Sequence, residues 1–479
     1  MEYSKFFLVL FFVGKGFSFI LNQLLEFVDY RHRINHGMEI PPEIQGYVDK
    51  LKLEQTCAYE DSKYFLWIIR NVVETIVSLI VVLYVYAYAQ QFSWIWTLNA
   101  YLTNLLFALF ISLPIAIIDI PFDLIQEFVI EKNYGFSKMT AKIWFFDQLK
   151  SLVLTLVIAV PLICVATALL IHVPRGWWAL LAAVYVVFSV VVSYLYPMVI
   201  APLFNKFTPL ESGELKNRLE KLLRKSGFSS NGIYVMDASK RSGHSNAYFT
   251  GLGKSKRIVL YDTLIKQLTP DEIEAVIGHE LGHYVNHHNI VHMAVTIPLV
   301  FIVLLILNLL VWRTDLYQSF HLIPHDEYIM DVLETHVIPD GYEHFFSTFR
   351  FMGIILSFTI FEGFLPLVNL VRNLFSRRNE FQADLYSAEI LNNAKTLCTA
   401  LIKMNKENLS EFTPPRFYCI FNYSHPPLLE RIEALKTFVP KEMPPEEKGF
   451  YISEKDLEEI PEKRGLLESA KQWLSLKKK

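Results

Sequence analysis

Residues 269–312 read TPDEIEAVIGHELGHYVNHHNIVHMAVTIPLVFIVLLILNLLVW, and they join a metal-binding motif to an apolar run. The first part predicts a well-capped helix, because Thr269 can act as the N-cap and Glu272 can complete a capping box. Residues 279–283 of that helix have the spacing HExxH. The second part, 290–312, is long and apolar enough to cross a membrane. The stretch therefore predicts a metal-bearing helix followed directly by a membrane span.

The HExxH motif places two imidazoles, those of His279 and His283, on one face of a helix. Imidazoles at this spacing bind one zinc ion, and the glutamate between them reaches a water on that metal. Zinc lowers the pKa of its water to about 7, so Glu280 can act as general base and later return the proton. The motif thus predicts one zinc ion per chain and peptide hydrolysis without a covalent intermediate.

A catalytic zinc usually takes three protein ligands and keeps its fourth position for water. The extension found in metzincins does not supply the third ligand, because Asn286 and Asn289 stand where glycine and histidine would be needed. His287 shares a face with His283, but the helix rise carries it about 6 Å farther along the axis. We therefore predict that His287 is a solvated polar residue.

A better candidate for the third ligand lies in RRNEFQAD, residues 377–384. Glu380 and Asp384 are four residues apart in a predicted helix, so both carboxylates face the same way. Glu380 can ligate the metal while Asp384 accepts a hydrogen bond from the outer nitrogen of a metal-bound imidazole. The spacing fits an exposed helix with salt bridges to Arg377 and Arg378 equally well. The residues by themselves leave both interpretations open.

The rest of the chain is apolar, since 52% of its 479 residues are hydrophobic and only 19% are charged. A helix needs about 20 apolar residues to cross a bilayer. Lys15 interrupts the first apolar run, but we expect a retained helix there, because a signal peptide would show an unbroken apolar core and a cleavage site. The predicted membrane spans are seven: 6–25, 64–89, 95–118, 151–173, 177–201, 290–312 and 351–371.

Composition also excludes some classes of protein. A formal net charge of -3 offers no general attraction to phosphate, so no nucleic-acid partner is expected. The four cysteines lie far apart with no CxxC pair, which argues against a disulfide scaffold or a zinc ribbon.

Lysine and arginine concentrate in the loops on one side of the predicted spans, and the positive-inside bias places that side in the cytosol. The other side includes the acidic loop 313–350. The predicted organisation is helices 1 to 5 with cytosolic loops at 1–201, a cytosolic zinc protease domain at 202–289, helices 6 and 7 with the lumenal loop at 290–371, and a cytosolic C-terminal domain that supplies the third zinc ligand at 372–479.

Short strands are predicted in the zinc domain at 233–236, 246–250 and 257–260, separated by turn-forming residues. Charges inside the predicted spans should avoid lipid. Arg70 and Glu74 are four residues apart and are predicted to pair with each other. Glu362 has no local partner and is predicted to face an interior.

The motifs together resemble a known family. HELGH at 279–283, SRRNEFQAD at 376–384 and NYSHPPLLERIEAL at 422–435 are similar to sequences of the membrane zinc metalloproteases that process prenylated CaaX proteins, the type I CaaX prenyl protease family. The similarity spans nearly the whole chain and is more specific than HExxH alone. Three further stretches agree: PFDLIQEFVIEKNYGFSKMT at 121–140, APLFNKFTPL at 201–210 and SKRSGHSNAYFTG at 239–251.

The resemblance implies a fold of seven membrane helices enclosing a water-filled chamber, capped by a mainly helical zinc domain of the gluzincin type with a small β-sheet. It implies that Glu380 is the third zinc ligand and that Asp384 is its orienting carboxylate. His425 matches a histidine that holds the oxyanion of the tetrahedral intermediate, where the simpler alternative is loop packing. Arg431 matches an arginine close to the active site, where the alternative is a surface charge.

Asn246 and Ala247 match, in the same family, an edge strand along which substrate binds as an added strand. The simpler alternative is that Asn246 is a turn residue at the beginning of a strand. In that mode of binding, backbone hydrogen bonds supply affinity with limited sequence preference.

The predicted function is that of a zinc-dependent endopeptidase of the endoplasmic reticulum or inner nuclear membrane, with its active site facing the cytosol or nucleoplasm. The resemblance implies that it removes the aaX residues of prenylated CaaX proteins and can make a further upstream cut. Its expected partners are such proteins or peptides and the lipid bilayer, because a prenyl chain brings its peptide to the membrane. Two alternatives stay open: a quality-control protease for misfolded or translocon-stalled chains, and a transporter or receptor with structural zinc.

Overall fold

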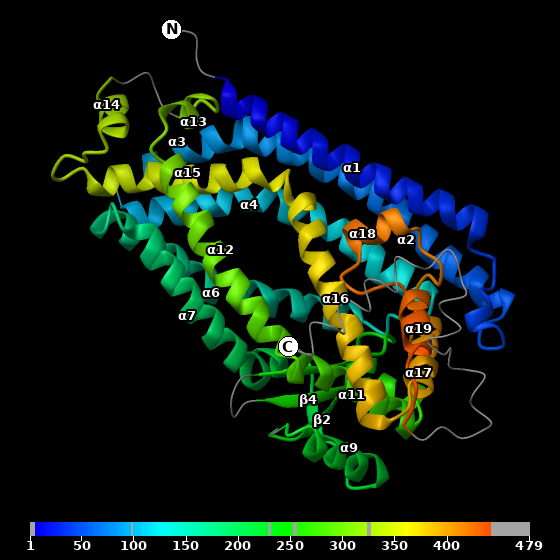
Figure 1. Ribbon diagram of the computed structural model, residues 1–479. Coiled ribbons are helices and arrows are strands. Elements are labelled where there is room, and N and C mark those ends of the chain that lie inside the picture. Colours follow the sequence, from blue (N-terminus) through cyan, green and yellow to red (C-terminus); the bar gives the residue numbers. More distant parts are fainter. Residues whose placement is uncertain (1–4, 97–98, 229–230, 252–255, 323–326, 442–479) are drawn as a thin grey trace.

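The computed structural model describes residues 5–96, 99–228, 231–251, 256–322 and 327–441 (Figure 1). Among these residues, seven helices are long and apolar enough to cross a membrane, which confirms the predicted number of spans. They begin with α1 (Phe6–His36) and α2 (Lys50–Ile80), which continues through a π-helical turn (Val81–Val85) into α3 (Tyr86–Trp96). The others are α4 (Ala100–Ile125), α6 (Ala141–His172), α7 (Trp177–Leu195), α12 (His288–Leu310) and α15 (Glu343–Glu362).

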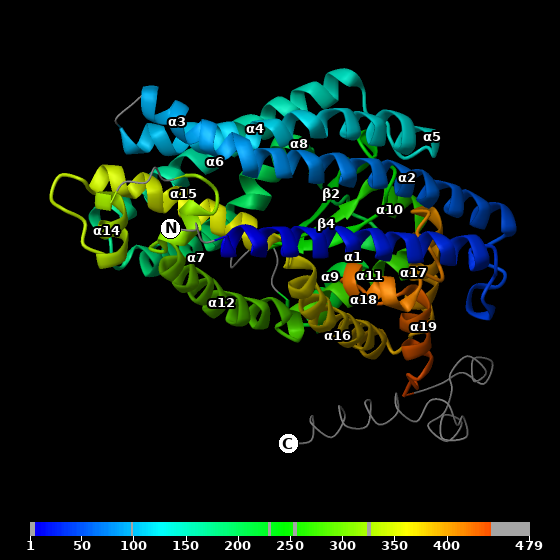
Figure 2. The same ribbon diagram turned by 90° about the horizontal axis from the view of Figure 1, so that it is seen from above.

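Figure 2 shows α1, α2 and α4 lying side by side, and residue contacts join α1 to α2 and α2 to α4. Phe7 and Phe11 of α1 are buried in the same hydrophobic core as the other long helices. π-helical turns also extend α4 into α5 (Glu131–Asn133) and α7 into α8 (Ala201–Phe204). The first helix is thus part of the bundle.

The seventh span differs from the prediction of 351–371. The helix α15 ends at Glu362, and α16 (Leu365–Leu391) begins after a break. Gly363 lies so close to α1 that a Cβ atom there would be 2.2 Å from the backbone of Gly14. Pro366, in the first turn of α16, cannot donate a backbone hydrogen bond to the preceding turn. Tertiary packing at this break, which apolar content does not report, sets the boundary.

Arg70 and Glu74 pair as predicted, and two further carboxylates join them. Arg70 Nε lies 2.6 Å from Glu74 Oε1. Asp119 and Asp123 of α4 also accept hydrogen bonds from the same guanidinium, at 2.9 and 3.0 Å. Glu362, which was predicted to face an interior, lies 3.8 Å from Lys15 of α1, and its place in a chamber stays a prediction. The water-filled chamber that the resemblance implies stays a prediction.

A four-stranded sheet lies in the described part of the segment 202–289, predicted as a zinc domain, in the order β1-β2-β4-β3. Its strands are β1 (Phe207–Pro209), β2 (Ile233–Met236), β3 (Ala247–Thr250) and β4 (Arg257–Tyr261). Strands β2 and β4 are parallel, and the other two pairs are antiparallel. Three strands were predicted, although β3 begins one residue later than expected. The strand β1 was missed because three residues show no periodicity. The strand β3 forms one edge of the sheet.

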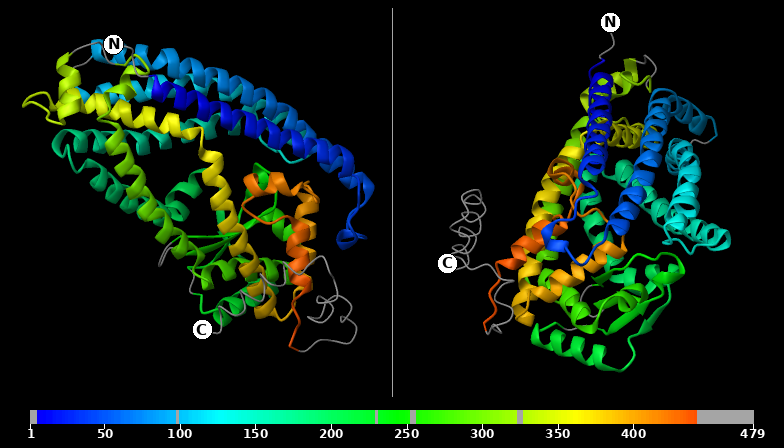
Figure 3. Two further views of the ribbon diagram at one scale, coloured as in Figure 1. Left: turned by 45° about the horizontal axis from the view of Figure 1, so that its top comes forward. Right: turned by 90° about the vertical axis from the view of Figure 1, so that its right-hand side faces the viewer.

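The segment 202–289 is otherwise mainly helical, as expected. Figure 3 shows the sheet and α9, in green, at one end of the molecule beyond the long helices. In Figure 1, α16 runs from the long helices into this end. The helices of the segment 202–289 at this end are α9 (Glu214–Lys225), α10 (Asp262–Gln267) and α11 (Pro270–Val285). The C-terminal segment adds α17 (Lys395–Glu407), α18 (Arg416–Asn422) and α19 (Leu428–Lys436). Between the sixth and seventh spans lie α13 (Thr314–Gln318) and α14 (Glu327–Thr335).

The helix α11 forms as its sequence predicts and packs tightly against α16. Both hydrogen bonds of the capping box between Thr269 and Glu272 are present. A Cβ atom on Gly282 would lie 2.7 Å from the Cα of Ala383 in α16. The glycine inside HELGH therefore allows the two helices to approach, and this approach brings their side chains to one site.

Candidate metal centre

Three of the predicted site residues meet between α11 and α16. One ligand atom each from His279, His283 and Glu380 lies within 4.8 Å of the other two. The Nε2 atoms of the histidines are 3.3 Å apart. The two carboxylate oxygens of Glu380 lie 3.4 Å from Nε2 of His279 and 3.3 Å from Nε2 of His283. The three donors therefore converge on one point.

Glu380 does not belong to an exposed salt-bridged surface, because it is only 4% exposed. Arg377, its expected partner in that alternative, instead donates hydrogen bonds to the backbone carbonyls of Cys419, Ile420 and Tyr423. Spacing alone allowed Glu380 to be either a metal ligand or part of an exposed, salt-bridged helix. Its burial excludes the exposed helix.

The three residues fit a metal ion. Glu380 Oε2 is buried and has no hydrogen-bond partner among the described residues. Burial raises the pKa of the Glu380 carboxyl, but the imidazoles of His279 and His283 beside it outweigh that effect and hold the pKa below its usual range. Two imidazole nitrogens and a carboxylate oxygen form a donor set typical of catalytic zinc. A bound cation would satisfy the carboxylate oxygen that the protein leaves without a partner.

Asp384 orients His279. Its Oδ1 lies 2.7 Å from Nδ1 of His279, and a carboxylate can only accept, so Nδ1 carries the proton and Nε2 is free for a metal. Arg431 donates to both oxygens of Asp384, at 2.9 and 2.6 Å. Burial raises the pKa of Asp384, but Arg431 outweighs it and lowers that pKa to about 2. Arg431 is therefore no surface charge, because it holds the carboxylate that holds His279.

A second orienting contact was missed from the sequence. His288 Nε2 lies 2.8 Å from Gln382 Oε1, an acceptor, so Nε2 carries the proton of this imidazole. Its Nδ1 must then accept from Nδ1 of His283, 2.9 Å away. That bond leaves Nε2 of His283 free for a metal, just as Asp384 does for His279. Gln382 is thus the outermost residue of this series of hydrogen bonds, which runs from Gln382 through His288 to His283.

The role of His288 was not predicted from the sequence because α11 ends before this residue. We predicted His287 to be solvated, and it is exposed. The helix α11 ends at Val285, and His287 has a left-handed backbone with φ of 56°. That turn brings His288 back toward His283. Two consecutive histidines after HELGH were the available signal, but helical spacing gave no reason to choose the second.

Replacing His288 with alanine is expected to weaken metal binding about 10- to 100-fold, the range typical of lost outer contacts to a metal ligand. The alanine leaves Nδ1 of His283 without its acceptor, so the ring loses its fixed tautomer. Competition with a chelating dye measures the affinity. His292→Ala, at an exposed histidine of α12, is the matched control and should bind metal like the unchanged protein. Equal affinities in the two variants would exclude this role for His288.

Glu280 lies where two cavities meet the metal centre. It lines a cavity of about 490 Å³ together with His279, and a second of about 840 Å³ together with His283. Burial raises the pKa of its carboxyl. The larger cavity is bounded by side chains of α7 and α12 and by the end of β3. Glu280 therefore borders both cavities.

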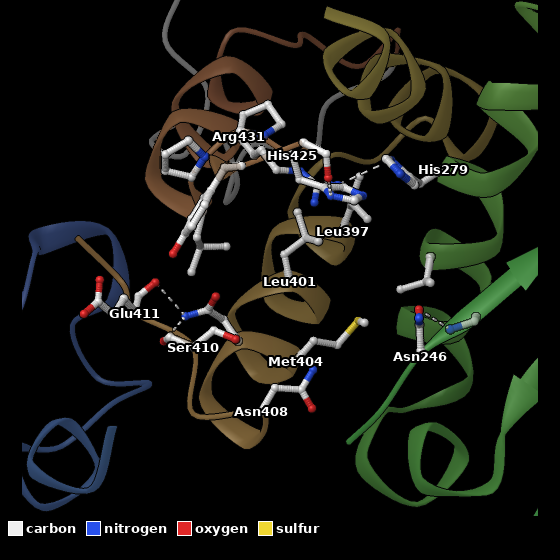
Figure 4. A pocket seen from close by; sticks show the side chains of 18 of the residues that line it. Asn246, His279, Leu397, Leu401, Met404, Asn408, Ser410, Glu411, His425 and Arg431 are labelled. Atoms are coloured by element: carbon white, nitrogen blue, oxygen red, sulfur yellow. Dashed lines mark hydrogen bonds between the residues drawn. The ribbon is translucent and has the colours of Figure 1, made fainter. Parts of the chain in front are cut away.

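The smaller cavity brings the remaining predicted residues together (Figure 4). Asn246 and Ala247 line one side, and His425 and Arg431 lie near His279. His425 Nε2 is 3.5 Å from Glu380 Oε1, and its side chain is 64% exposed. Leu397, Leu401 and Met404 of α17 form an apolar wall of this cavity. Asn246 directly precedes β3, and its carbonyl accepts a hydrogen bond from Tyr261 N at 3.0 Å.

Most of the chain matches two models of known protein families. Residues 209–439 match peptidase family M48, and residues 29–206 match a model described as CAAX prenyl protease N-terminal, five membrane helices. The CAAX prenyl protease 1 homolog of Oryza sativa subsp. japonica is 34% identical over 436 residues, covering 86% of this chain and 93% of the relative. The chain belongs to the CAAX prenyl protease 1 family. This membership makes it a membrane metalloprotease, as the sequence predicted.

Other members of the CAAX prenyl protease 1 family agree. The protein named CAAX prenyl protease 1 in Saccharomyces cerevisiae is 38% identical over 328 residues, covering 67% of this chain and 69% of the relative. The Homo sapiens homolog is 32% identical over 374 residues, covering 70% and 74%. The crystal structure of S. mikatae Ste24p has a TM-score of 0.77 at 28% identity and covers 89% of this chain and 99% of that one. This match confirms the predicted fold class.

Proposed function

We propose that this family member is a zinc-dependent endopeptidase that removes the aaX residues of prenylated CaaX proteins at the cytosolic face of the endoplasmic reticulum or inner nuclear membrane. The observation that carries the proposal is the convergence of His279, His283 and Glu380 beside Glu280, at the junction of two cavities. The names of the relatives support the substrate class. A further upstream cut would use the same site.

The proposed mechanism gives Glu280 the proton transfers. His279, His283 and Glu380 would hold one zinc ion, which when bound supplies an acidified water and polarises the scissile carbonyl. Glu280 takes the proton of the attacking water and returns it to the leaving amine. Burial raises its pKa, which brings the carboxyl closer to the neutral range where one group can both accept and return a proton.

The walls of the smaller cavity would bind the peptide and stabilise charge. The edge of β3 beginning at Asn246 and Ala247 offers backbone groups for pairing with an extended substrate. His425, exposed to the cavity, would donate a hydrogen bond to the oxyanion. Arg431 would act through Asp384, because it holds that carboxylate against His279. The apolar wall from α17 suits the aliphatic residues of a CaaX sequence.

The basic loops of the sequence support this orientation, because the positive-inside bias favours a cytosolic position for both the zinc domain and the C-terminal domain. Ligands from both of these segments meet at the metal centre. A prenylated substrate held at the membrane surface would then reach the site from the same side.

The purified protein in detergent is expected to cut a farnesylated CaaX peptide faster than its unprenylated twin, in a reaction that a chelator stops and added zinc restores. Peptide mass after timed incubation measures the cut. Equal rates on the two peptides would favour the quality-control protease. No cleavage of either peptide by zinc-loaded protein would favour the transporter or receptor with structural zinc.

A further inference from the structure

Two stretches of the sequence that have no part in the metal centre meet in the fold. The first stretch, 121–140, contains the end of α4 and the short helix α5. The second stretch, 239–251, leads into β3 and contains it. Ser137 and Ser242 face each other in an isolated antiparallel bridge. Gly243 N donates to the carbonyl of Phe136 at 2.7 Å. A loop of the membrane region therefore pairs with the segment that precedes the proposed substrate strand.

Side chains reinforce this pairing. The His244 ring stacks on Phe136, with centroids 3.9 Å apart and an interplanar angle of 16°. His244 Nε2 lies 3.3 Å from Glu131 Oε2. The other oxygen of Glu131 accepts hydrogen bonds from Tyr59 OH at 2.8 Å and Gln126 Nε2 at 2.7 Å. Glu131 is thus fixed by α2 and by the π-helical turn that follows α4, and in turn it holds His244.

His244 is also held through its backbone by α10, outside the membrane region. Its carbonyl accepts a hydrogen bond from Thr263 Oγ1 at 2.9 Å. The next residue, Ser245, donates its backbone N–H to Asn408 Oδ1 at 3.0 Å. Arg241, on the other side of the pairing, donates to both oxygens of Asp147 in α6 at 2.8 and 3.1 Å. The segment from Arg241 to Ser245 is therefore anchored on both sides immediately before Asn246.

We propose that Glu131 is a positioning residue of the peptidase, which acts through His244 to hold the beginning of β3 where substrate pairs with it. The inference rests on the proposed function, in which Asn246 and Ala247 bind the peptide backbone. Glu131 lines neither cavity at the metal centre, so it acts without touching substrate. We call Glu131, Phe136 and His244 the β3 brace.

The β3 brace should affect substrate binding more than chemistry. A loosened strand must be ordered again each time a peptide pairs with it, and that cost weakens binding. The metal ligands lie on α11 and α16 and have no contact with the brace in the hydrogen bonds and ion pairs of the described residues. KM should therefore rise while kcat is retained.

Glu131→Gln is expected to raise KM for the farnesylated peptide about fivefold, since it replaces a charge-assisted hydrogen bond with a neutral one. We expect kcat to stay within about twofold of the unchanged protein. Glu54→Gln is the matched control, because it makes the same change at an exposed residue of α2. His244→Gln, which keeps a donor near the position of Nε2, should raise KM less than His244→Phe, which keeps only the stacking.

A disulfide staple separates positioning from other effects of the lost charge. Opposite residues in an antiparallel pair have Cα atoms about 4.5 to 5.5 Å apart, within the range that a disulfide spans. Ser137→Cys with Ser242→Cys should form such a link. In the Glu131→Gln background, the oxidised staple is expected to return KM to near its original value, and reduction should raise it again.

The same variants are measured for their affinity for a fluorescent farnesylated CaaX peptide, so that the brace is tested even where cleavage fails. An inactive but zinc-loaded parent protein would contradict the proposed function and leave the affinity comparison to decide on the brace. Glu131→Gln with unchanged KM and affinity would overturn the inference. A raised KM that the oxidised staple leaves unchanged would overturn it too.

Discussion

Replacing Glu280 with glutamine is expected to lower kcat about 10²- to 10⁴-fold, the usual contribution of a positioned general base, while the metal content stays unchanged. The amide has nearly the shape of the carboxylate but cannot take a proton from the attacking water. Glu280 is not among the three residues whose ligand atoms converge. The loss should therefore fall on chemistry and leave the metal centre intact.

Cleavage of the farnesylated peptide at saturating concentration measures the change in kcat, and elemental analysis of the same sample measures bound zinc. The protein with structural zinc, considered as an alternative from the sequence, predicts no functional loss in this variant. A Glu280→Gln protein that keeps full cleavage activity would therefore remove Glu280 from the mechanism. A protein that loses its zinc would show that the glutamate supports the metal as well.

At this site, the sequence predicted local structure well and predicted tertiary contacts less well. The capping box and the HExxH spacing lie within one helix, so residues a few positions apart determine the geometry. The position of Glu380 depends on how α16 packs against α11. This close packing is possible because Gly282 has no side chain. Spacing along α16 could not report that packing, and the resemblance to a family was needed to choose between a ligand and a surface charge.

Residues that act across a break in regular structure were the hardest to predict. His288 reaches His283 because the backbone of His287 turns into the left-handed region, which a helical projection does not contain. Asp119 and Asp123 join the Arg70 pair from another helix, which the local pairing rule did not consider. Periodicity in the sequence predicts helices and strands, but the contacts between them can be identified only once the fold is known.

Replacing Glu380 with glutamine is expected to reduce zinc affinity by more than the 10- to 100-fold typical of changes outside the metal ligands. The variant removes the one negative charge among the three donors, and a neutral amide oxygen is a much weaker zinc ligand. Peptide cleavage should fall with zinc occupancy and recover partly when zinc is added in excess. This dependence on added zinc distinguishes the variant from Glu280→Gln, whose loss no amount of zinc restores.

Glu389→Gln is the control for this variant, since it makes the same change at an exposed residue of the same helix. It should bind zinc and cut peptide like the unchanged protein. A Glu380→Gln protein that binds zinc equally tightly would exclude Glu380 as a ligand. The buried carboxylate would then serve only to hold His279 and His283 by the contacts at 3.4 and 3.3 Å, and a different group would have to complete the metal centre.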